Sequence, residues 1–103
     1  MTMKDVVLNK KVLVRSDASG VHFGTLVEWD RDTVHLRDSR RLWAWNTGGT
    51  GISLSEIAIC GVKHETSKIT MPLPDIIIVG VCEIIPCHGM AIATIETAEV
   101  AKP

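Results

Sequence analysis

The sequence of 103 residues lacks an excess of charge of either sign, a long apolar run and an even set of cysteines. Eleven basic and twelve acidic residues give a net charge of -1, without the positive field that long nucleic acids attract. The longest apolar run, from Ile76 to Cys82, is too short to cross a bilayer. Three cysteines favour reduced thiols over a disulfide framework. We expect a cytosolic protein without a membrane or long nucleic acid as partner.

Motifs for secretion, metal binding, phosphate binding and catalysis are also missing. The charged N-terminus has no cleavage pattern and predicts no signal peptide. Cys82, Cys87 and His88 have the wrong spacing for a metal site, and neither CxxC nor HxxxH occurs. The GGTG stretch has no lysine where a phosphate-binding loop needs one. We therefore expect no metal, no cofactor and no enzymatic activity.

Composition and alternation predict one folded domain, residues 1–103. Hydrophobic residues make up 46% of the chain, enough for a core. The alternating segments 10–15 and 21–29, joined by the turn SDASG, predict a hairpin. After a second turn, TVHLRD predicts a third strand with Val34 and Leu36 on one face.

The second half of the chain mixes helical and strand signals. The Gly-rich stretch 46–51 is typical of a flexible loop, and Ser53 with Glu56 three residues later predicts the start of a short helix. The polar segment 62–74 predicts an irregular connection, and 75–85 a buried strand bent at Gly80. The tail, 88–103, predicts a short, frayed helix. The fold class is α+β, a small antiparallel sheet of about five strands with one or two short helices.

The segment RRLWAWN contains the most informative side chains. Strand alternation places Arg41, Trp43 and Trp45 on one face, beside Arg40. Nucleobases stack on indole or guanidinium planes, and arginine binds phosphate with two parallel hydrogen bonds. The pattern therefore fits a nucleotide ligand, but it fits tryptophans in a core or interface beside solvated arginines equally well.

Several separate motifs then occur in a recognisable order: RSDASGVHFGTL, DSRRLWAWN, SLSEIAICGVK and EIIPC. Together they resemble the first type of Thoeris anti-defence protein, a phage family. The resemblance implies a sponge that sequesters cyclic ADP-ribose isomers such as glyco-cyclic ADP-ribose, and cyclic di- or trinucleotides of CBASS-type signalling, without cleaving them. It implies a homo-oligomer, either a dimer or a hexamer built as a trimer of dimers, in the cytoplasm of the infected bacterial host.

Motif position also implies which residues bind the ligand. Three positions depart from the family pattern: Ser19 replaces alanine, Ser39 replaces alanine, and Ala44 replaces the aromatic between the tryptophans. The implied ligand-binding residues are Arg15, Ser19, Gly20, Val21, His22, Arg40, Arg41, Trp43, Trp45, Lys63, Ser67 and Lys68. A second site, dependent on the oligomer, is placed in the loop at Asn46, Thr47, Gly48, Gly49 and Thr50.

Two other functions remain open from the sequence alone. A phosphodiesterase or hydrolase that degrades such signals would draw on His22, His35 and Cys87. A small β adaptor would bind protein or single-stranded nucleic acid through its aromatics, although the near-neutral charge argues against nucleic acid.

Overall fold

The computed structural model describes residues 1–51 and 53–102, and over this part the chain forms a six-stranded antiparallel sheet with three α-helices. The α+β class is confirmed, with one strand and at least one helix more than expected. In chain order the elements are α1 (Met3–Val7), β1 (Lys11–Ser16), β2 (Gly20–Asp30), β3 (Thr33–Ala44), α2 (Leu54–Cys60), a 3-10 turn (His64–Thr66), β4 (Lys68–Ile69), β5 (Leu73–Ile78), β6 (Val81–Pro86) and α3 (Gly89–Glu96). None of the helices in the described residues is long and apolar enough to cross a membrane.

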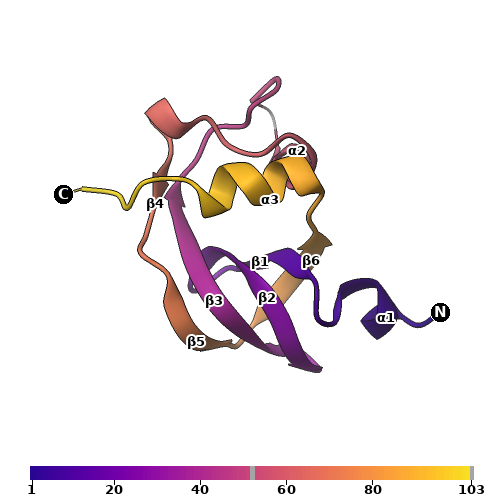
Figure 1. Ribbon diagram of the computed structural model, residues 1–103. Helices are drawn as coiled ribbons and strands as arrows, with labels where there is room; N and C mark the ends of the chain where they lie inside the picture. Colours follow the sequence, from indigo (N-terminus) through magenta and orange to yellow (C-terminus); the bar gives the residue numbers. More distant parts are fainter. Residues whose placement is uncertain (52, 103) are drawn as a thin grey trace.

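The sheet is built around β3, the longest strand. Its order is β4-β3-β2-β1-β6, and β5 pairs with the first half of β3 while β4 pairs with its end. The chain therefore passes from the edge beside β3 to the edge beside β1 between β5 and β6. Figure 1 shows α3 lying across the sheet, with α2 close to one end of it and α1 near the N-terminus away from both.

The expected single strand over 75–85 is wrong. Gly80, with a φ of 70°, lies in the turn between β5 and β6, and the two halves of this segment pair with different strands. β5 is also mostly exposed rather than buried: Ile77 is more than half exposed, as is Val79 just after the strand. The apolar residues of this segment therefore lie partly on the surface and partly in the core. The segment 62–74, expected to be irregular, contains β4 and the first residues of β5.

Two hydrophobic clusters lie on the two faces of the curved sheet. The first packs the sheet against α2 and α3, with Leu13, Phe23, Leu42, Ile57 and Ile95 among its buried members. The second fills the other face and contains Val12, Val14, Leu26, Leu36 and Ile78. The hairpin of β1 and β2 contributes to both because successive strand residues point to opposite faces.

A β-bulge at Asp38 changes which residues of β3 face the helices. Asp38 has a φ of 53°, and the pairing shifts so that Gly24 lies opposite two residues of β3. An inserted residue reverses the alternation beyond it. Leu36 therefore packs in the second cluster whereas Leu42 packs in the first. A Cβ at position 24 would lie 3.0 Å from the Arg37 carbonyl oxygen, so the crowded position opposite the bulge suits glycine.

The helices follow local capping signals. Ser53 caps α2, whose C-cap is Gly61, and α3 forms within the expected tail, so both of these predictions are confirmed. Helix α1 was not predicted. Thr2 and Asp5 form a capping box around its first turn, a T-x-x-D signal that is visible in the sequence.

Candidate functional site

The candidate site begins at the tight turn between β1 and β2. Gly20 adopts a φ of 85°, a left-handed conformation that favours glycine. His22, two residues later, is only 1% exposed, and its Nε2 lies 3.1 Å from the Ser19 carbonyl oxygen and 3.2 Å from Ser19 Oγ. The buried imidazole therefore stabilises the turn through its contacts with Ser19.

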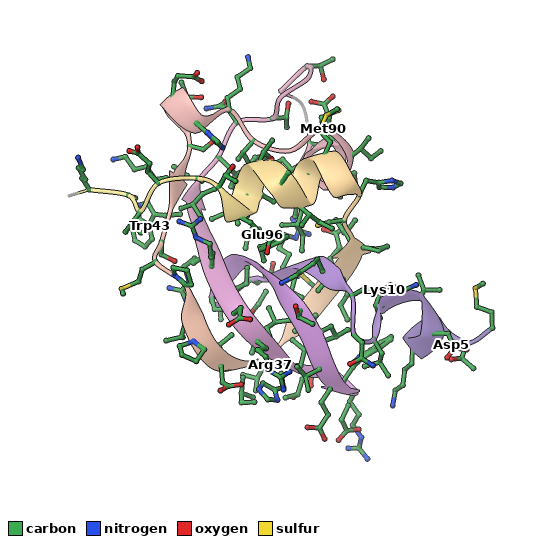
Figure 2. The ribbon with its side chains drawn as sticks, in the orientation of Figure 1. Asp5, Lys10, Arg37, Trp43, Met90 and Glu96 are labelled. Atoms are coloured by element: carbon green, nitrogen blue, oxygen red, sulfur yellow. The ribbon has the colours of Figure 1, made fainter. Side chains whose placement is uncertain are left out.

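A groove of about 310 Å³ lies between this turn and the end of β3. Arg41 and Trp43 line it on one side and the turn residues on the other; its full lining is Ala18, Ser19, Gly20, Val21, Arg41, Leu42 and Trp43. The Trp43 side chain is 72% exposed and lies at the outer edge of the molecule in Figure 2. Within the described residues, no carboxylate lies within 4.0 Å of the Arg41 guanidinium. A cation and a bare indole face are thus available together.

A second hollow, of about 240 Å³, shares Arg41 with the groove. Its lining is His22, Ser39, Arg41, Thr70, Met71, Leu73 and Ile76. His22 reaches it because its backbone pairs directly with that of Arg41. Burial, together with the nearby positive charge of Arg41, lowers the pKa of His22 below its ordinary value of 6.5. The ring is therefore neutral at physiological pH.

Comparison with known protein families shows to which family this chain belongs. The family model described as a domain of unknown function, DUF6948, matches residues 9–95, which is most of the chain. The chain belongs to the DUF6948 family. No curated protein and no solved structure matches it. The matched range of this DUF6948 domain includes both hollows and the complete sheet.

The two adjacent arginines of the DUF6948 domain occupy different environments. Arg40 is 5% exposed, and its Nε donates to the Thr70 carbonyl oxygen at 2.7 Å. One terminal nitrogen donates to the carbonyl oxygens of Ile95 and Ala98, at 2.9 and 2.7 Å, near the end of α3. Arg40 thus holds α3 against the sheet, and it does not line either hollow.

The predicted aromatic ladder is wrong at Trp45. The pairing of β3 with β4 shifts between Leu42 and Ala44, so one extra residue is inserted at Trp43. This second irregularity reverses the alternation again, and Trp45 packs against the first hydrophobic cluster. Trp43 is the tryptophan that faces the groove, whereas Trp45 supports the core of the DUF6948 domain.

The other implied residues lie outside the groove. Arg15 is opposite Val21 in the sheet, but its Nε lies 3.6 Å from a Glu83 carboxylate oxygen. Lys63 and Lys68 are exposed, and Ser67 Oγ accepts from the Asn46 amide at 3.0 Å. Lys63, Ser67 and Lys68 therefore lie near the loop after β3 and not near the turn after β1.

The glycine-rich loop, Asn46 to Gly51, is organised around Glu56 of α2. The Glu56 carboxylate accepts hydrogen bonds from the hydroxyls of Thr47 and Thr50 and from the amide of Gly51, at 3.0 Å for the last. These donors lower the pKa of Glu56 to about 2. This arrangement could not be predicted from the sequence, because capping-box spacing predicts that Glu56 turns back toward Ser53. The Gly51 amide and the hydroxyls of Thr47 and Thr50 are the donors that a phosphate in the predicted second site would need. In this structure they bind the Glu56 carboxylate instead.

The residues considered for catalysis or metal binding are dispersed in the DUF6948 domain. Burial raises the pKa of Cys87 to about 12, so its thiol stays protonated and is a poor nucleophile. His35 lies 2.8 Å from Asp75 on the outer surface of β3 and β5, a pair that the sequence did not predict. Within the described residues, no three His, Cys, Asp or Glu side chains gather as metal ligands would.

Proposed function

We propose that this DUF6948 domain is an anti-defence sponge that binds and sequesters a cyclic nucleotide signal, a cyclic ADP-ribose isomer or a cyclic di- or trinucleotide, without cleaving it. The observation that carries the proposal is that Arg41, which has no ion-pair partner in the described part of the chain, and the exposed indole of Trp43 line one groove. In this role the protein acts in the cytoplasm of an infected bacterial host and blocks anti-phage signalling.

The chemistry of the groove suits such a ligand. The Arg41 guanidinium offers several N–H donors and a full charge to a phosphate or pyrophosphate. The Trp43 indole offers a flat face to an adenine ring, and stacking of this kind contributes roughly 1–3 kcal/mol per base. Among the described residues, the groove lining contains no carboxylate that would repel the phosphates. Binding by charge and stacking requires no general base, which fits sequestration without reaction.

A second candidate function, hydrolysis of the same signal, draws on the contact between Ser19 Oγ and His22 Nε2. However, Nε2 also faces the Ser19 carbonyl oxygen, which can only accept a hydrogen bond, so this nitrogen carries the hydrogen and cannot take the serine proton. His22 Nδ1 is buried and has no hydrogen-bond partner in the described residues, so no carboxylate orients the ring. These features favour binding over hydrolysis.

We further propose that the protein assembles as a homo-oligomer, a dimer or a trimer of dimers. Leu73 and Ile77 are exposed apolar residues of β5, and Met71 before the strand and Val79 after it are exposed as well. Exposed apolar side chains that gather on and beside one strand are typical of an interface. Ile77→Lys should shift the mass measured by light scattering toward the monomer, and an unchanged mass would show that this face is not the contact.

Equilibrium binding of glyco-cyclic ADP-ribose, measured by calorimetry, tests the proposed function. Trp43→Ala should weaken binding about 5- to 150-fold, as expected for the loss of one stacked base, and Trp43→Phe should retain most of the affinity. Arg41→Met should weaken it comparably. Arg37→Met is the matched control, because Arg37 is exposed on β3 and lies outside both hollows. Equal binding by Arg41→Met and Arg37→Met would contradict the proposal, as would loss of the signal through Ser19-dependent turnover.

A further inference from the structure

His22, which lines the second hollow, carries a buried ring nitrogen that has no hydrogen-bond partner in the described part of the chain. His22 is 1% exposed, and Nδ1 is the one buried side-chain nitrogen or oxygen without a hydrogen-bond partner in the described residues. A buried polar atom left unpaired costs roughly 1–3 kcal/mol, so such atoms are uncommon without a reason. His22 also lines the hollow, so a group bound there would lie beside the ring that carries this atom.

The tautomer of His22 defines which group can bind there. Nε2 faces the Ser19 carbonyl oxygen at 3.1 Å, and only an N–H makes a favourable contact with a carbonyl oxygen. In a neutral ring the other nitrogen, Nδ1, then has a free lone pair. At this nitrogen the ring can therefore accept a hydrogen bond from an O–H or N–H donor but cannot bind a bare anion.

The rest of the lining is complementary to the two sides of a sugar ring. Ser39 and Thr70 contribute hydroxyls; Thr70 Oγ1 accepts from the Arg41 amide at 2.9 Å, which leaves its hydrogen free to donate outward. Leu73 and Ile76 provide an apolar wall. A ribose has hydroxyls along one edge and C–H groups on its face, so it matches both. At about 240 Å³ the hollow is below the roughly 300–1,000 Å³ typical of pockets for whole drug-sized ligands, and one sugar ring suits it.

We propose that this hollow is a ribose subsite, in which a ribose hydroxyl donates to His22 Nδ1 while the hydroxyls of Ser39 and Thr70 bind its neighbour. The inference rests on the proposed function, because Arg41 lines both the hollow and the groove and would hold the phosphate between this ribose and the nucleoside whose base stacks on Trp43. His22 then selects ligands by the presence and position of a free ribose hydroxyl.

Imidazole nitrogen NMR of the full chain tests the subsite with a simple probe, ribose 5-phosphate. The expected result is a change in the Nδ1 resonance of His22 alone, with His35, His64 and His88 as internal references, and a weaker change with 2-deoxyribose 5-phosphate. No change at His22, or equal changes with the two sugars, would overturn the inference.

Calorimetry with glyco-cyclic ADP-ribose separates this inference from the proposed function. His22→Phe and Ser39→Ala should each weaken binding by about tenfold, the loss expected for one buried hydrogen bond, while the control His35→Phe binds as the wild type does. If His22→Phe does not fold, Ser39→Ala and the NMR titration still decide. Full binding by folded His22→Phe would refute the subsite alone. A wild type that fails to bind glyco-cyclic ADP-ribose, yet shows the His22 response to ribose 5-phosphate, would refute the sponge and retain the subsite.

Discussion

Replacement of Arg40 by methionine should destabilise the fold strongly, whereas the same change at its neighbour Arg41 should not. Arg40 makes three short hydrogen bonds, of 2.7 to 2.9 Å, to the carbonyl oxygens of Thr70, Ile95 and Ala98. Hydrogen bonds from a charged group contribute roughly 1.5–3 kcal/mol each, offset by the cost of burying the guanidinium. We expect a net loss of about 3 kcal/mol for Arg40→Met.

The assay is thermal and denaturant unfolding of matched variants. For a domain of this size, about 3 kcal/mol corresponds to a fall in Tm of roughly 12–24 °C. Arg40→Lys keeps the charge but loses the planar fork, so it should lie between wild type and Arg40→Met. Arg41→Met should change stability by less than about 0.5 kcal/mol while it weakens ligand binding. If Arg40→Met unfolds together with the wild type, or Arg41→Met is the less stable of the two, the separate roles assigned to these arginines are wrong.

Three further predictions concern the frame around the site. Gly61→Ala should cost at least about 2 kcal/mol in chemical denaturation, because Gly61 has a φ of 78° and an added Cβ would overlap Thr94 Oγ1; stability equal to wild type would contradict this. The pKa of Glu56 is lowered to about 2 from 4.5, so its carboxylate stabilises the fold above about pH 4.5 and loses that effect as the pH falls toward 2; Glu56→Gln should flatten stability over this range, and an unchanged pH profile would refute the assignment. Iodoacetamide should modify the exposed Cys82 well before Cys87, whose burial raises its pKa to about 12, and mass spectrometry of timed digests would expose the opposite order.

Local signals in the sequence were sufficient for much of the fold. The turn ending in Gly20, the alternation of Val34 and Leu36, and the cap at Ser53 each depend on a few neighbouring residues, and each prediction is confirmed. The strand over 75–85 failed because apolar composition does not reveal which strand will pair with a segment. Only tertiary pairing made Gly80 a turn between two strands.

The candidate site was less accessible to sequence reasoning because two bulges alter the alternation along β3. Strict alternation from Arg41 to Trp45 places both tryptophans on one face. The shift beside Trp43 sends Trp45 to the core, and the bulge at Asp38 brings Ser39 to the hollow beside His22. Bulges follow from pairing with other strands, so the separation of Arg40 from Arg41 and the contribution of Ser39 were not readable from spacing.

Recovery of ligand from the saturated protein tests most directly whether Arg41 and Trp43 hold a cyclic nucleotide without changing it. The wild type is incubated with glyco-cyclic ADP-ribose, separated from free ligand, denatured by heat, and the released material is identified by chromatography and mass. We predict intact ligand in an amount proportional to the protein, and little from Trp43→Ala. Release of a cleaved product, or of nothing, would contradict the account.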